Sequence, residues 1–143
     1  MRVRAAGLLL RHDALLLVQH RKEGKSYWLL PGGGVKVGER LEDCLKREFR
    51  EELNLDIEIS DLILVVETIS GLGEHILQPT FSVTATGVDT IEVGSDKRVV
   101  DYRFFKQDAI DDLIIYPDIR DELHDYLRSG RVSHRYVLKK WLD

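Results

Sequence analysis

A proline followed by three glycines at residues 31–34 divides the first part of the chain into two segments of different periodicity. Before it, segments 3–10, 15–20 and 27–30 predict three short strands, the first two joined by a polar turn at His12 and Asp13. After it, residues 39–53 predict a helix, since apolar side chains recur at every fourth position beside Cys44 (Leu41, Leu45, Phe49 and Leu53). Consecutive glycines are unfavourable inside regular elements, so we expect a loop at 31–34 whose backbone approaches another group closely or takes positive φ.

The remaining segments alternate strands with short helices. Segments 55–69 and 75–86 flank Gly71, Leu72 and Gly73 and predict a β-hairpin. Residues 98–105 predict a further strand, 107–113 a short helix, and 118–128 an amphipathic helix that stops at Gly130. The tail, 131–143, is compatible with a strand, a helix or a docking arm. This order of mostly antiparallel strands and helices indicates the α+β class.

Composition narrows the class of protein. A chain of 143 residues can bury one sizeable core, so we expect a single domain over 1–143. The net charge of -4 argues against a protein that grips a nucleic-acid polymer by broad electrostatic attraction. The single cysteine excludes an internal disulfide and fits a reducing compartment. Charges at 11–13 interrupt the apolar N-terminal runs before membrane-spanning length, so we expect a cytoplasmic protein without a membrane segment or a cleaved signal.

The predicted helix carries a cluster of acids, in the run REFREELNL at 47–55. Glu48 and Glu52 lie four residues apart on one helical face, with Glu51 beside both. Like charges at this spacing cost roughly 0.2–0.5 kcal/mol per pair. An ordinary solvated helix also carries glutamate pairs, but it does not account for the preceding glycines, or for Glu39 and Arg47 at fixed offsets. The cluster therefore predicts a positive group over this face.

The spacing from Gly33 to Leu55 resembles the signature of the Nudix hydrolases: a glycine, five residues, a glutamate, seven residues, and then the run REFREELNL. Asn54 replaces the usual last glycine, and Phe49 is bulkier than the usual aliphatic residue. Asparagine tolerates the left-handed conformation at a helix end, so we expect Asn54 to preserve the turn. The resemblance covers 3–128, most strongly 28–55, and implies a Nudix-like α/β/α sandwich with a mixed, mostly antiparallel sheet.

The resemblance also implies roles for the signature residues. Glu48, Glu51 and Glu52 would be catalytic residues that ligate Mg²⁺, with Mn²⁺ as an alternative, and the carbonyl of Gly32 would join them. Hard carboxylate oxygens on one helical face suit such an ion. Glu39 and Arg47 would orient the cluster, Arg47 through hydrogen bonds to a neighbouring carboxylate. Asp96, in a polar loop where the family often supplies a further acid, is a candidate ligand or base.

The substrate side of the site is less defined. Gly33 and Gly34 are candidates for contact with substrate, and Arg21 and Lys25 for contact with its phosphates, although solvated loop charges would look the same. Three aromatic residues in strands are candidates for stacking on a base or for the core (Tyr27, Phe81 and Phe105). Three histidines lack metal-like spacing, and we assign them no role (His20, His75 and His124).

These features favour an enzyme: a Mg²⁺-dependent pyrophosphohydrolase that cleaves a nucleoside diphosphate linked to another moiety, such as a nucleoside triphosphate or ADP-ribose, by attack of water. One alternative is a binding module that senses a nucleotide without cleaving it. Another is isomerase chemistry on an isoprenyl diphosphate, which calls for a cysteine opposite a glutamate, whereas Cys44 fits the core better. The expected partner is a small nucleotide, and the tail, through Tyr136, Val137 and Trp141, is a candidate homodimer contact.

Overall fold

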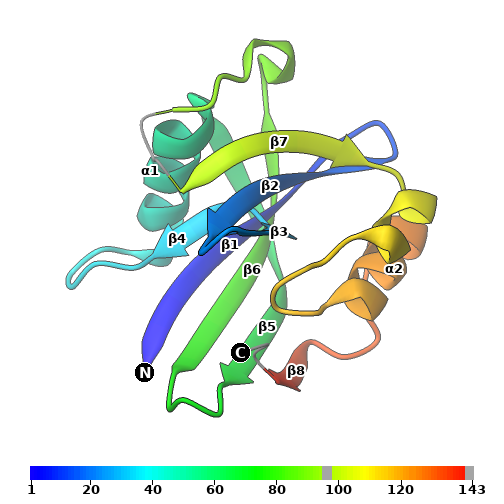
Figure 1. Ribbon diagram of the computed structural model, residues 1–143. Coiled ribbons are helices and arrows are strands. Elements are labelled where there is room, and N and C mark those ends of the chain that lie inside the picture. Colours follow the sequence, from blue (N-terminus) through cyan, green and yellow to red (C-terminus); the bar gives the residue numbers. More distant parts are fainter. Residues whose placement is uncertain (95–97, 141–143) are drawn as a thin grey trace.

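The computed structural model describes residues 1–94 and 98–140. Strands and helices alternate along the chain much as the periodicity predicts (Figure 1). The elements are β1 (Arg2–Arg11), β2 (Ala14–Lys22), β3 (Lys25–Leu29), β4 (Gly32–Gly34), α1 (Leu41–Leu53), β5 (Ile57–Ile69), β6 (His75–Ala85), the 3₁₀ turn η1 (Val88–Thr90), β7 (Val99–Phe105), the 3₁₀ helix η2 (Gln107–Asp112), α2 (Arg120–Ser129) and β8 (Tyr136–Lys140).

The strands form one mixed sheet in the order β3-β2-β1-β6-β5-β8, with β4 paired to β1 and β7 paired to β2. The hairpins β1–β2, β2–β3 and β5–β6 are antiparallel, as are β1–β4 and β2–β7. Only β1–β6 and β5–β8 are parallel among the named strand pairs of the described chain. The expected mixed, mostly antiparallel sheet is confirmed.

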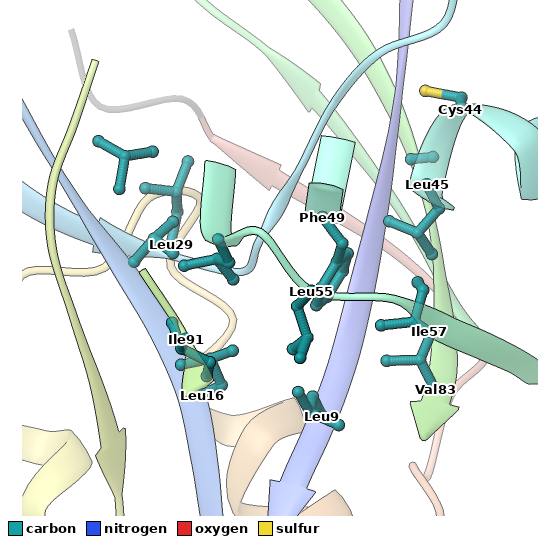
Figure 2. Packing of buried hydrophobic residues seen from close by; sticks show 14 residues of the cluster. Leu9, Leu16, Leu29, Cys44, Leu45, Phe49, Leu55, Ile57, Val83 and Ile91 are labelled. Carbon is teal, nitrogen blue, oxygen red and sulfur yellow. The ribbon is translucent and has the colours of Figure 1, made fainter. Parts of the chain in front are cut away.

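Alternation along β2 shows how the sheet is covered on both faces. Leu15 and Leu17 belong to the core cluster that includes residues of α2, whereas Leu16 and Val18 belong to the cluster that includes residues of α1. Successive side chains of a strand point to opposite faces, so the two helices cover opposite faces of the sheet. Figure 2 shows the α1 cluster, in which Phe49 is fully buried. The predicted α/β/α sandwich is confirmed.

The glycine segment differs from the expectation of a loop. Gly32–Gly34 form the short strand β4, with Ala6 paired to Gly32 and Arg4 to Gly34. The expected close approach does occur, because a Cβ on Gly32 would lie 2.0 Å from the carbonyl oxygen of Ala5. Glycine is therefore what lets the strand lie against β1.

The C-terminal tail joins the chain's own sheet. Strand β8 pairs in parallel with β5, from Val65 with Tyr136 to Ile69 with Lys140. Tyr136 and Val137 thus lie in an intramolecular edge strand and not in a free docking arm, which corrects that alternative. Trp141 lies outside the described residues. No helix in the described part of the chain is long and apolar enough to cross a bilayer.

Candidate active site

Helix α1 supplies the acids, and its two ends are defined by local sequence. It begins at Leu41, two residues later than the periodicity suggests, and Leu41 itself is 36% exposed and lies outside the buried ridge. At the other end Asn54 takes the left-handed conformation, with φ 52° and ψ 42°, and its N–H donates to the carbonyl of Arg50 at 3.0 Å. The expected role of Asn54 as a helix stop is confirmed.

The glycines of β4 bring the backbone onto the glutamates. A Cβ on Gly33 would lie 2.2 Å from Cδ of Glu48, so that only glycine leaves room for this carboxylate. The N–H of Gly32 donates to Oε1 of Glu52 at 3.0 Å. By contrast, nothing lies within 4 Å of a Cβ built on Gly34. Gly32 and Gly33 thus set the positions of two signature glutamates.

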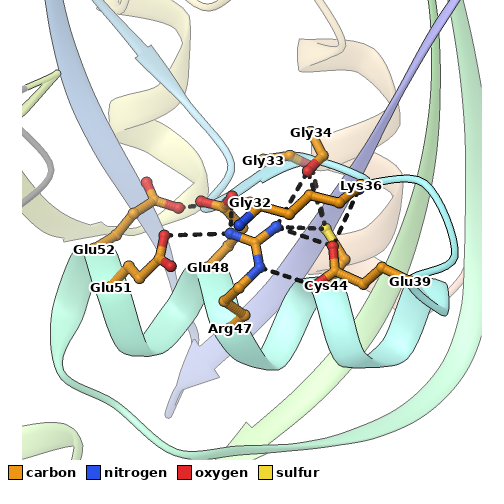
Figure 3. Close-up of polar contacts among 10 residues, drawn as sticks. All are labelled: Gly32, Gly33, Gly34, Lys36, Glu39, Cys44, Arg47, Glu48, Glu51 and Glu52. Carbon is orange, nitrogen blue, oxygen red and sulfur yellow. Dashed lines mark hydrogen bonds and ion pairs between the residues drawn. The ribbon is translucent and has the colours of Figure 1, made fainter.

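Arg47 is the positive group at the centre of the cluster (Figure 3). Its Nε and Nη2 donate to both carboxylate oxygens of Glu39 at 2.8 and 3.0 Å. Its Nη1 donates to Glu48 at 2.9 Å and to Glu51 at 3.3 Å, and Nη2 also reaches the carbonyl of Gly34 at 3.2 Å. The planar guanidinium therefore connects Glu39, which precedes the helix, to α1 and to β4 through hydrogen bonds.

The acids around Arg47 differ in the direction of their pKa shifts and in their exposure to solvent. The hydrogen bonds from Arg47 lower the pKa of Glu39 to about 2, so Glu39 remains a carboxylate. Burial raises the pKa of Glu48, whose side chain is only 6% exposed, although Arg47 opposes that shift. The side chain of Glu51 is 46% exposed. The acids therefore form a gradient from the buried Glu48 and Glu52 to the solvent-facing Glu51.

The described residues contain no three acidic, histidine or cysteine side chains already gathered as a metal site. Glu48 and Glu51 turn toward Arg47 instead. The donor chemistry still fits a hard cation, because Oε2 of Glu48 is buried and accepts no hydrogen bond from the described part of the chain. Glu48, Glu51 and Glu52 are thus suitable residues to hold Mg²⁺ once Glu48 and Glu51 turn from the guanidinium.

Other predicted site residues lie apart from this cluster or outside the described chain. Arg21 and Lys25 are in the β2–β3 hairpin, where Nε of Arg21 donates to Ser26 Oγ at 3.4 Å, and within the described residues neither forms a hydrogen bond or ion pair with the signature glutamates. Asp96 lies outside the described residues. The segment that leads to it is fixed on α1, since the N–H of Gly94 donates to the carbonyl of Glu52 at 2.8 Å.

The aromatic candidates and Cys44 have structural surroundings. Tyr27 stacks on Tyr116 with centroids 4.7 Å apart, and Phe105 meets Trp28 edge to face. Phe81 packs against the α1 core. Cys44 is fully buried, and burial raises the pKa of its thiol to about 11, which confirms the interpretation of this residue as core.

One polar group near the site was missed from the sequence. The guanidinium of Arg4 donates to Gln78 Oε1 at 3.0 Å and to the carbonyl of Leu30 at 2.8 Å. The negative charges of Glu52 and Glu48 raise the pKa of Arg4, although burial lowers it more. A charged residue in an N-terminal strand carries no local signal of this role, because its partners come from β6 and from the end of β3.

A sandwich in which a glycine strand is laid over an acid-bearing helix, with an arginine tying the two together, defines a protein of the Nudix type. A family model described as the NUDIX domain matches residues 1–126, and the chain belongs to that family.

Individual curated relatives are similar to this chain over short segments. Nucleoside triphosphatase NudI from Salmonella heidelberg is 46% identical over 46 residues, which are 32% of this chain and 33% of that protein. NudI from Salmonella arizonae is 54% identical over 35 residues, 24% of this chain and 25% of that protein. The matched segment therefore spans about a third or less of the length of these curated relatives.

Solved structures resemble the whole fold. A NUDIX hydrolase from Nitrosomonas europaea has a TM-score of 0.78 at 20% identity, covering 97% of this chain and 78% of that one. An ADP-ribose pyrophosphatase from Streptococcus suis has a TM-score of 0.70 at 21% identity, covering 97% and 98%. A MutT NUDIX hydrolase from Burkholderia pseudomallei is 30% identical, with a TM-score of 0.68 over 75% of this chain and 84% of that one. At their identities, the first two show the fold alone.

Proposed function

We propose that the protein is a Mg²⁺-dependent pyrophosphohydrolase that cleaves a nucleoside diphosphate linked to another moiety. The observation that carries this proposal is the arrangement of the three signature glutamates on α1: Arg47 binds Glu48 and Glu51, Gly32 binds Glu52, and Gly33 leaves space for Glu48. Burying two glutamates against a glycine strand is unfavourable for an ordinary surface helix, because buried charges cost free energy unless they are paired. A divalent ion bound to these glutamates would compensate that cost.

In the proposed reaction, water attacks one phosphorus atom and the bridging P–O bond breaks. The leaving phosphate takes the bridging oxygen, and the products are a nucleoside monophosphate and a second phosphorylated compound. When bound, Mg²⁺ would neutralise charge on the diphosphate oxygens and favour deprotonation of water. One glutamate of the cluster accepts the proton of the attacking water.

The residues around the cluster have positioning roles in this proposal. Glu39 accepts two hydrogen bonds from Arg47, at 2.8 and 3.0 Å, and so orients the guanidinium that positions the acids. The carbonyl of Gly32 and the carboxylate of Asp96 complete the candidate ligand set, and Arg21, Lys25, Gly33 and Gly34 the candidate substrate contacts. Because Glu48 and Glu51 accept hydrogen bonds from Arg47, we expect their carboxylates to turn from Arg47 toward the ion when it binds.

The relatives support two substrate classes. The NudI matches favour nucleoside triphosphates, and the fold likeness to an ADP-ribose pyrophosphatase keeps ADP-ribose as the second class. The test is a panel of ribo- and deoxyribonucleoside triphosphates and ADP-ribose with Mg²⁺ or Mn²⁺, with products separated by chromatography. We expect a nucleoside monophosphate from at least one substrate. Tight binding of these nucleotides without any phosphate-bearing product would contradict hydrolysis and favour the nucleotide-sensing module.

The isomerase alternative is disfavoured by the position of Cys44. Its thiol lies 3.5 Å from the carbonyl of Gly33 within the core and has a raised pKa, whereas that chemistry needs a cysteine facing the substrate. Incubation with isopentenyl diphosphate should give no double-bond migration. Migration that disappears in Cys44→Ala would reverse this ranking.

A further inference from the structure

The guanidinium of Arg4 is held beside the proposed site without a carboxylate of its own. Arg4 projects from β1, and its terminal nitrogens donate to Gln78 Oε1 at 3.0 Å and to the carbonyl of Leu30 at 2.8 Å. Both acceptors are neutral. Among the described residues, no carboxylate lies within ion-pair distance of Arg4. Since arginine stays charged in proteins, the fold keeps a cation here that has no directly bonded carboxylate among the described residues.

Chain connectivity places this cation near the glutamates. Leu30, which accepts from Arg4, is two residues before Gly32, and Gly32 donates to Glu52. Two residues of chain span at most ~7 Å. The dominant charges that act on Arg4 are those of Glu52 and Glu48, in agreement with this placement. The guanidinium is therefore close to the acids that would hold the metal but is not bonded to them.

The same region of the sheet contains a second unused polar group. Gln78 is directly opposite Val66 in β5, and Thr68 lies two residues further along that strand on the same face. Thr68 is 2% exposed, and its hydroxyl has no hydrogen-bond partner in the described part of the protein. Buried polar atoms are normally satisfied, so this part of the sheet has an unsatisfied hydroxyl in addition to a cation with unused donors.

From these contacts we propose that Arg4 binds a non-bridging phosphate oxygen of the diphosphate, next to the metal held by Glu48 and Glu52. This inference rests on the proposed function and adds a binding residue to it. A guanidinium has five N–H donors. Two serve Gln78 and Leu30 and fix its orientation, which leaves donors for the paired hydrogen bonds that arginine makes to phosphate.

The test compares Arg4→Met with Arg2→Met, a matched control. Arg2 lies on the same strand, and its exposed side chain lies 3.8 Å from the carboxylate of Glu74. Two quantities are measured: KM for the substrate found in the nucleotide panel, and the affinity for inorganic pyrophosphate by calorimetry without divalent metal. We expect Arg4→Met to raise KM and weaken pyrophosphate binding by at least about tenfold, as loss of a charged hydrogen bond implies. Arg2→Met should change neither by more than about twofold.

A purely structural role for Arg4 predicts a different result. In that case Arg4→Met lowers the melting temperature but keeps KM and pyrophosphate affinity within about twofold of the parent, and this outcome would overturn the proposal. Should Arg4→Met fail to fold, Arg4→Lys is the second variant. Lysine preserves the charge but not the planar set of N–H donors, and we expect a higher KM with a normal kcat. Unchanged KM in Arg4→Lys also counts against phosphate binding.

The two proposals fail in distinguishable ways. If the parent protein hydrolyses nothing in the panel, the proposed function is wrong, while the pyrophosphate titration still measures the role of Arg4. If the parent hydrolyses nucleotides and Arg4→Met has the parent's KM and pyrophosphate affinity, only the assignment of Arg4 is wrong.

Discussion

Replacing Gly33 by alanine tests whether the glycine strand sets the position of the catalytic acids. The added Cβ would lie 2.2 Å from Cδ of Glu48 and 2.3 Å from its Oε1. Real Cβ contacts are essentially never shorter than 3.0 Å, so the carboxylate or the strand must move by about 1 Å. The group that must yield is the end of the Glu48 side chain, which also accepts the 2.9 Å hydrogen bond from Arg47.

The expected loss follows from this displacement. A misplacement of about 1 Å in a positioned catalytic group costs on the order of 10²-fold in rate. That factor corresponds to about 2.7 kcal/mol in the activation free energy. Because the atoms that must move are the end of a flexible side chain and not backbone, we expect the free energy of unfolding to change much less than the activation free energy.

The assay measures kcat/KM on the best substrate of the panel, together with urea denaturation of the same preparation. Gly34→Ala is the matched comparison, since nothing lies within 4 Å of a Cβ built there, and any loss in it measures the combined cost of alanine in this strand and of a changed substrate contact. Activity of Gly33→Ala within about threefold of Gly34→Ala would refute the reasoning. An equal collapse of folding in both variants would also refute it.

Three further predictions concern stability and self-association. Phe49 is fully buried, so Phe49→Ala should lower the free energy of unfolding by about 3–5 kcal/mol in urea denaturation, and a loss below 1 kcal/mol would show that the α1 core is loosely packed. Hydrogen bonds from Tyr136 and His75 lower the pKa of Glu67 below its ordinary 4.5, so its stabilising contribution is present above that value and is lost as pH falls through the folded pKa. Glu67→Gln should therefore shrink the stability difference between about pH 7 and about pH 3, and an unchanged difference contradicts this. Ending the chain after residue 135 removes β8 and exposes the edge of β5, so size-exclusion chromatography should show self-association, whereas an unchanged elution profile would mean that β8 does not protect this edge.

Local signals predicted the part of the site that lies on one helix. The spacing of Glu48, Glu51 and Glu52 depends only on helical periodicity, and the stop at Asn54 depends only on which residues tolerate the left-handed conformation. The resemblance to the Nudix signature, and not periodicity, implied that Arg47 bonds a neighbouring carboxylate, and it bonds Glu39, Glu48 and Glu51. The helical spacing and the helix stop span few residues, which is why the sequence alone contains them.

Features that depend on distant strands were not predicted. Gly32–Gly34 become a strand because β1 supplies the pairing partner, a contact that no local propensity contains. The position of Arg4 likewise requires Leu30 and Gln78 to come from two other parts of the sheet. The tail was ambiguous because β8 is stabilised by pairing with β5 and has little periodicity of its own. Periodicity specifies which face a residue occupies, but not which strand lies beside it.

The most direct test of the proposed metal site is Mg²⁺-dependent turnover by Glu52→Gln at saturating Mg²⁺. Glu52 is 1% exposed and accepts from Gly32, and glutamine preserves its shape while removing the charge that would hold the ion. Loss of an outer partner of a metal ligand costs roughly 10–100-fold, so loss of a ligand should cost at least that much in kcat. Turnover equal to that of the parent, with the folded state intact by circular dichroism, would contradict the assignment of this cluster as the metal-binding and catalytic centre.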